Sequence, residues 1–224
     1  MADIAVVSLS GGMDSCVVTA MTHAIGMELA LLHGDYGQRT EARERRAFEA
    51  IADFYGVPAN RRLVVDFTGL RAIGGSALTD PSIPIPAGDL QAAGIPTTYV
   101  PFRNAHLLSA CTSWGEVLRA RALVVGFVEE DSSGYPDCRE AFFRAFEVAA
   151  NLGTRPDTRL AFHAPLLHLK KADIVRKGLE LGAPLQLSWS CYQGEDLACG
   201  RCDSCLLRLR GFLDAGLPDP IPYA

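Results

Sequence analysis

The sequence lacks an excess of positive charge. Its 21 lysine and arginine residues are outnumbered by 26 aspartate and glutamate residues, which gives a net charge of −5 at pH 7. This balance argues against binding to nucleic acid or to anionic membranes. No apolar run reaches the ~18 residues that a membrane helix requires, and the first residues lack the pattern of a secretory signal. We therefore expect a cytoplasmic protein without a membrane or nucleic-acid partner.

Two common nucleotide-binding motifs are also missing from the first turn of the chain. The G-x-x-x-x-G-K-[ST] loop needs a lysine that does not follow here, and G-x-G-x-x-G does not fit. The turn instead reads Leu9-Ser10-Gly11-Gly12-Met13-Asp14-Ser15, between an apolar run at 4–7 and a helical pattern at 16–25. Glycines at such a turn let backbone N–H groups approach an anion at the positive end of a helix. We interpret it as a phosphate-binding loop; an ordinary Gly-Gly turn with a capping Asp or Ser is the alternative.

Cysteine is present in an odd number and is unevenly distributed. Four of the seven cysteines, Cys191, Cys199, Cys202 and Cys205, have the spacing C-x7-C-x2-C-x2-C. An odd number with this crowding favours metal ligation in a reducing compartment over a disulfide framework. Four thiolates suit a closed, structural zinc site. An iron–sulfur cluster or a redox pair is the alternative.

The remaining pattern predicts an α/β fold. Strand-like runs at 4–9, 28–33, 62–66 and 122–127 alternate with helical patterns at 15–25, 40–55 and 103–119. This alternation is typical of a parallel sheet with helices on both faces. The Gly- and Pro-rich region 69–101 is expected to be mostly irregular and functional. We divide the chain into an ATP-binding domain, 1–182, and a small zinc-binding subdomain, 183–224, packed on it.

Four further segments carry side chains that could bind a ligand. Segment 35–39 follows the second strand, and the third helical pattern begins at Arg103 and Asn104. Residues 129–139 follow the fourth strand, where acids flanking an aromatic side chain could recognise a flat heterocycle; a polar loop with capping acids is the alternative. Lys171 lies at the start of another helical pattern, where a cation could contact phosphate or carboxylate. For Lys171, for segment 35–39 and for Arg103 with Asn104, a capping or surface role is an equal alternative.

Together these segments resemble the 7-cyano-7-deazaguanine synthase family of the PP-loop ATP pyrophosphatases, which makes a precursor of queuosine. The combination of GYPDC with the cysteine-rich tail is the most specific part of the resemblance. The matching segments are SGGMDS (10–15), DYGQR (35–39), SIPIP (82–86), VPFRN (100–104), DSSGYPDCR (131–139), PL with a following lysine (165–171) and SCYQG…CGRCDSC (190–205).

The resemblance implies an adenosine-nucleotide hydrolase-like fold, a homodimer and one structural zinc. It also implies adenylation of 7-carboxy-7-deazaguanine by ATP with magnesium, conversion to an amide by ammonia, and a second adenylation that yields the nitrile. The candidate ATP-binding residues are Leu9, Ser10, Gly11, Gly12, Met13, Asp14, Ser15, Tyr36, Gln38 and Arg39. The candidate catalytic residues are Ser10, Asp14, Ser15 and Lys171. The candidate substrate residues are Phe102, Arg103, Asn104, Asp131, Tyr135, Asp137 and Cys138.

One residue departs from the family pattern. At the third position of VPxRN the family usually has glycine or alanine, whereas this chain has Phe102. A phenyl ring that filled space near the pocket would change the substrate or the acceptor. The alternative function is therefore a related enzyme that stops at the amide, or that transfers the acyl group to another amine such as a protein N-terminus. A PP-loop enzyme that modifies tRNA is a further alternative.

Overall fold

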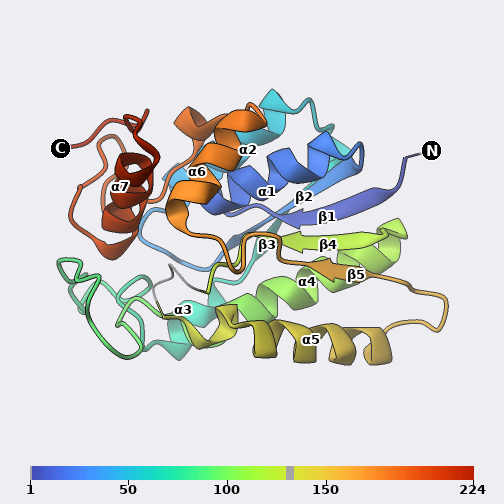
Figure 1. The fold of residues 1–224 in the computed structure, drawn as a ribbon. Helices are drawn as coiled ribbons and strands as arrows, with labels where there is room; N and C mark the ends of the chain where they lie inside the picture. Colours follow the sequence, from blue (N-terminus) through green and yellow to red (C-terminus); the bar gives the residue numbers. More distant parts are fainter. Residues whose placement is uncertain (1, 130–133) are drawn as a thin grey trace.

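The computed structural model describes residues 2–129 and 134–224, which form a parallel sheet between two layers of helices (Figure 1). The strands are β1 (Ile4–Ser8), β2 (Glu28–Asp35), β3 (Arg62–Asp66), β4 (Ala122–Val125) and β5 (Ala161–His163). Their order is β3-β2-β1-β4-β5, and every neighbouring pair is parallel. The predicted α/β class with a parallel sheet is confirmed. The strand β5 was not predicted, because three residues are too few to show a periodic pattern.

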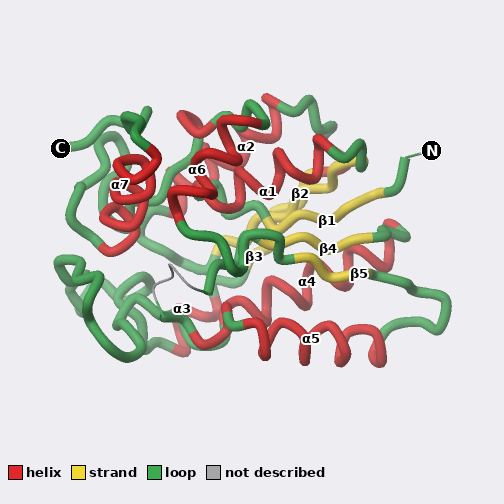
Figure 2. Tube along the Cα trace, viewed as in Figure 1, coloured by secondary structure: helices red, strands yellow, loops and turns green. Residues whose placement is uncertain are grey.

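Seven α-helices accompany the sheet in the described part of the chain. They are α1 (Met13–Ala24), α2 (Glu41–Phe54), α3 (Gly69–Ile73), α4 (Arg103–Leu118), α5 (Glu140–Gly153), α6 (Lys171–Glu180) and α7 (Asp203–Ala215). Helices α1, α2 and α6 cover one face of the sheet, while α4 and α5 cover the other (Figures 1 and 2). None of the helices described is long and apolar enough to cross a bilayer.

The apolar core has two parts, one on each face of the sheet. In β1, Ala5 and Val7 pack in the core under α1 and α6, whereas Val6 packs in the core under α4 and α5. Because both faces are buried, the strand sequences are continuously apolar. Strands β1 and β4 are neighbours in the sheet. After β1 the chain enters α1 on one face of the sheet, whereas after β4 it enters α5 on the opposite face, which leaves a crevice between the two connections. A crevice at the carboxyl ends of such strands is the usual ligand site of an open α/β sheet.

The region 69–101 contains α3 and is otherwise irregular, as expected. Its backbone is attached to other parts of the chain. The Arg39 Nη2 donates to the carbonyl oxygen of Asp80 at 2.9 Å, and the Gly88 N–H donates to the Arg201 carbonyl at 2.7 Å. The Asp89 N–H donates to Asp203 Oδ1 at 3.0 Å. This loop therefore lies against the start of α7.

A buried ion pair anchors the C-terminal segment. The Arg208 side chain, only 1% exposed, binds both carboxylate oxygens of Asp219, with Nε–Oδ2 2.8 Å and Nη2–Oδ1 3.0 Å. Its Nη1 also donates to Ser188 Oγ at 2.7 Å. The attraction within a buried pair of this kind roughly offsets the cost of removing both charges from water, but loss of one partner leaves a buried charge without compensation.

We expect Asp219→Ala to lower the free energy of unfolding by about 3–5 kcal/mol. The matched control is Asp173→Ala, which removes the aspartate of the half-exposed Arg176–Asp173 pair and should cost less than about 1 kcal/mol. Urea unfolding of both variants measures the difference. Equal losses in the two variants would contradict the importance of the buried pair.

Candidate active site

The loop between β1 and α1 has the geometry of an anion-binding turn. Gly11 has φ +86°, and a Cβ there would lie 2.6 Å from the Glu44 carbonyl oxygen, so glycine is required. Gly12 is the N-cap of α1 and provides no side-chain cap. Ser15 Oγ donates to the Gly12 carbonyl at 2.9 Å and lies 3.1 Å from Ser10 Oγ. A helix start without a side-chain cap is suited to bind phosphate.

An ion pair connects this loop to a helix far along the chain. Lys171, the first residue of α6, places its Nζ 2.6 Å from Asp14 Oδ2. The lysine side chain is only 8% exposed. The other carboxylate oxygen, Asp14 Oδ1, is buried and has no hydrogen-bond partner within residues 2–129 and 134–224. The loop therefore presents a buried cation beside a carboxylate oxygen that can still accept a ligand.

Opposite the loop, the start of α4 forms a second polar group. Arg103 Nη1 donates to the Tyr36 hydroxyl at 3.1 Å, and Nη2 donates to Asn104 Oδ1 at 3.2 Å. Its Nε is buried without a hydrogen-bond partner among the described residues. Asp137 accepts both from the Asn104 backbone N–H, at 3.0 Å, and from its Nδ2, at 3.1 Å. Asp137 thus holds Asn104 in place, and Arg103 retains a donor for a ligand.

One cavity brings together most of the predicted site residues. Those that line it are Ser10, Gly12, Met13, Asp14, Ser15, Tyr36, Arg103, Asn104, Tyr135, Cys138 and Lys171. Those that do not line it are Leu9, Gly11, Gln38, Arg39, Phe102 and Asp137. Asp131 lies outside the described residues. Burial raises the pKa of the Cys138 thiol to about 12, so this cysteine is poorly suited to be a nucleophile.

Three of the residues outside the cavity have other contacts. Gln38 Oε1 accepts the Tyr36 backbone N–H at 2.8 Å, and Arg39 binds the loop at Asp80. Phe102, with φ +58°, is 55% exposed, and its ring packs edge-on against Phe142, with the ring centres 5.7 Å apart. The ring therefore points away from the cavity and does not fill the pocket.

Several cavity residues were missed by the sequence analysis. Glu44, in the helical pattern at 40–55, lines the cavity, and Thr40 Oγ1 donates to its carboxylate at 2.8 Å. Burial raises the pKa of Glu44. Because the residues next to Glu44 in the sequence are also charged, the sequence pattern does not distinguish it as a cavity residue. Among the others, five polar or aromatic residues come from the C-terminal segment: Trp189, Ser190, Tyr192, Ser204 and Arg208.

The C-terminal segment is joined to the cavity through Trp189 and Tyr192. The Trp189 N–H donates to the Gly11 carbonyl at 2.8 Å. The Tyr192 hydroxyl lies 3.3 Å from that of Tyr135, which donates to Thr98 Oγ1 at 3.0 Å. The segment therefore forms one wall of the cavity. The SCYQG motif contains Ser190 and Tyr192 and was the available signal for this wall.

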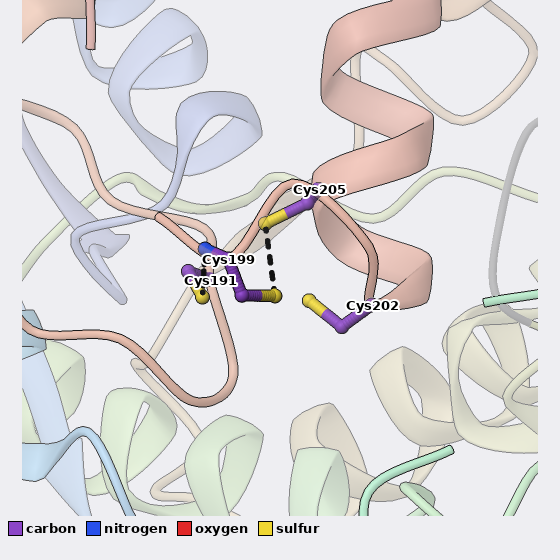
Figure 3. A group of neighbouring side chains, drawn as sticks. All are labelled: Cys191, Cys199, Cys202 and Cys205. Carbon is purple, nitrogen blue, oxygen red and sulfur yellow. Dashed lines mark hydrogen bonds between the residues drawn. The ribbon is translucent and has the colours of Figure 1, made fainter. Parts of the chain in front are cut away.

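The four clustered cysteines, from the same C-terminal segment, lie together near the start of α7 (Figure 3). Their Sγ atoms are all within 4.8 Å of one another, and those of Cys199 and Cys205 are 3.9 Å apart. Zn–S bonds of about 2.3 Å in a tetrahedron place sulfurs just under 4 Å apart, so the cluster fits a metal. The Cys202 and Cys205 thiols, with the backbone N–H groups of Cys199 and Gly194, lower the pKa of Cys191. The predicted grouping of these four residues is confirmed.

Comparison with known proteins agrees with this geometry. Residues 4–216 match the family model described as "Queuosine biosynthesis protein QueC". A protein of Chlorobium phaeobacteroides (strain DSM 266) named 7-cyano-7-deazaguanine synthase is 56% identical over 219 residues, which cover 98% of this chain and 96% of the relative. A protein of the same name from Chloroherpeton thalassium is 55% identical with the same coverage.

A solved structure supports the fold alone. A 4-thiouridine synthetase, solved with RNA and bound ATP, has a TM-score of 0.52 and 19% identity to this chain. The likeness covers 99% of this chain but only 47% of the synthetase chain. The match to the QueC model over almost the whole chain, together with these curated relatives, shows that the chain belongs to the QueC family of queuosine biosynthesis proteins.

Proposed function

We propose that this chain is an ATP-dependent synthase that converts 7-carboxy-7-deazaguanine and ammonia to 7-cyano-7-deazaguanine. The observation that carries the proposal is the 56% identity, over nearly the full length of both chains, to a curated relative with this name. The cavity supports this proposal, because the phosphate-binding loop (residues 9–15, called the phosphate loop below) and the pair Arg103 and Asn104 line the same space. A carboxylate must be activated before ammonia attacks it, and adenylation next to a phosphate loop provides that activation.

In the proposed reaction, the phosphate loop holds ATP. When ATP binds, the Ser10 and Ser15 hydroxyls exchange their contacts with each other and with the Gly12 carbonyl for donation to phosphate oxygens. The N–H groups at the start of α1 donate to phosphate oxygens as well. Lys171 is a buried cation placed to stabilise the charge that develops on the departing pyrophosphate. Asp14 Oδ1, buried and without a partner among the described residues, is a suitable magnesium ligand because magnesium prefers carboxylate oxygens.

In this proposal the residues across the cavity from the phosphate loop, at the start of α4, bind the substrate. Arg103 Nε, which has no hydrogen-bond partner among residues 2–129 and 134–224, donates to the substrate carboxylate. Tyr135 and Asn104 contact the heterocycle, while Asp137 positions Asn104 without touching the substrate. Gln38 and Arg39 also act indirectly, by holding Tyr36 and the loop that contains Asp80.

We also propose that the cysteine cluster holds zinc and that 183–224 functions as a subdomain organised by it. A metal held by Cys191, Cys199, Cys202 and Cys205 has no open position, so its contribution is structural. It keeps Tyr192 and Ser204 in the cavity wall. A homodimer is part of the proposal through the family resemblance.

The proposal is tested by the products. Purified protein incubated with 7-carboxy-7-deazaguanine, ATP, magnesium and ammonium should yield a product with the mass of the nitrile, detected by mass spectrometry. Because two adenylations precede the nitrile, pyrophosphate should form in twice the amount of nitrile. Without ammonium neither the nitrile nor the amide should form. Accumulation of the amide alone would contradict the proposal and favour the related enzyme that stops there.

A further inference from the structure

The buried histidine at the end of β2 lies beside the phosphate loop but has no place in the reaction described above. His33 is 1% exposed and lies between the sheet and α2, where its ring centre is 5.3 Å from that of Phe48. Burial of an imidazole is unfavourable unless its nitrogens have partners. The contacts of its two nitrogens therefore indicate why it is there.

Both ring nitrogens of His33 face oxygen acceptors. Nδ1 lies 3.1 Å from the carbonyl oxygen of Leu9, within hydrogen-bond geometry. Nε2 lies 3.2 Å from Asp35 Oδ1, but neither of these two atoms has a hydrogen-bond partner among the described residues. Asp35 Oδ2 is in turn 3.2 Å from Arg45 Nη1 of α2. Glu44, also on α2, is a further ionisable group that interacts with the ring. Since the Leu9 oxygen can only accept, Nδ1 carries a proton in this contact.

Leu9 is the residue through which this contact reaches the loop. Its N–H donates to the Leu32 carbonyl at 2.8 Å, so residues 32 and 33 of β2 hold both of its backbone polar groups. A trans peptide is planar, and its carbonyl and N–H point in opposite directions. Holding the Leu9 carbonyl therefore also sets the direction of the Ser10 N–H, at the residue where the cavity lining of the loop begins.

We propose that His33 is a positioning residue for the phosphate loop. It donates from Nδ1 to the Leu9 carbonyl, and the packing of its ring between the sheet and Phe48 keeps it in this orientation. This inference rests on the proposed role of the loop in binding ATP. His33 itself does not line the cavity, so its effect on the nucleotide passes through the Leu9–Ser10 peptide.

The test uses side chains that replace one ring nitrogen at a time. In His33→Asn the amide nitrogen takes the place of Nδ1, and in His33→Gln it takes the place of Nε2. The dissociation constant of a non-hydrolysable ATP analogue with magnesium is measured by calorimetry. We expect His33→Gln and His33→Leu to weaken binding about tenfold, the loss of one buried hydrogen bond, and His33→Asn to weaken it less than about threefold.

A merely structural role would give a different pattern. Thermal unfolding midpoints of the three variants would then fall, while the dissociation constants for the analogue would be alike in the Asn and Gln variants; that result would overturn the inference. The Asn–Gln comparison does not depend on whether the leucine variant folds. The proposed function can fail separately, because wild-type protein that binds the analogue but forms no nitrile would contradict the synthase and leave the His33 comparison intact.

Discussion

Lys171→Met is expected to lower kcat for pyrophosphate release by about 10²–10³, the loss typical for removal of one preorganised group that stabilises developing charge. The structural reason is the position of Nζ, 2.6 Å from Asp14 Oδ2 at the phosphate loop, on a side chain that is only 8% exposed. In such a site a cation acts without competition from water, so its removal has a larger effect than at a surface. The loss of kcat is measured from the steady-state release of pyrophosphate with saturating ATP and saturating 7-carboxy-7-deazaguanine.

The adjacent lysine provides a matched control. Lys170 is exposed and does not line the cavity, and Lys170→Met removes the same charge one residue away. Its kcat should remain within about twofold of wild type, because exposed charges contribute little. Thermal unfolding of both variants separates catalysis from folding. Equal kcat in the two variants would show that Lys171 does not act on the reaction.

Cys202→Ser is expected to abolish stable metal binding and to unfold the C-terminal segment. The apparent binding free energy of a structural zinc site is about 10–16 kcal/mol. Removal of one of four thiolate ligands opens the site, and we expect the metal to be lost with its contribution to folding. Cys202 is the N-cap of α7, and this segment supplies Tyr192 and Ser204 to the cavity wall. Activity should therefore fall together with the metal content, which is measured by mass spectrometry of the eluted metal.

The control is a buried cysteine outside the cluster. Cys16 lies on α1 and is fully buried in the apolar core between α1 and the sheet. The variant Cys16→Ala should therefore keep one metal ion per chain, even if its free energy of unfolding is lower. A strong chelator should lower the unfolding midpoint of wild type and of Cys16→Ala, but not that of Cys202→Ser. Full metal content in Cys202→Ser would contradict the four-cysteine site.

Much of the site was predictable because its parts are local. The glycines between β1 and α1 and the C-x2-C-x2-C spacing fix backbone geometry within a few residues, and sequence shows such geometry directly. The central strands were predicted for the same reason, since burial of both faces makes them continuously apolar. The helical patterns at 15–25, 40–55 and 103–119 correspond to α1, α2 and α4. The short edge strand β5 and helix α7 were not predicted.

The sequence by itself determined the fold class and the family, and its local patterns marked the glycine turn between β1 and α1 and the cysteine cluster. Only the tertiary structure decided which distant side chains meet: Lys171 reaches Asp14 across 157 positions, and Glu44 turns from a charged helix into the cavity. It also decided that Asp137 holds Asn104 and that Phe102 points outward. Those outcomes depend on how the sheet and helices pack. Packing is set by the whole core, and no short window of sequence contains it.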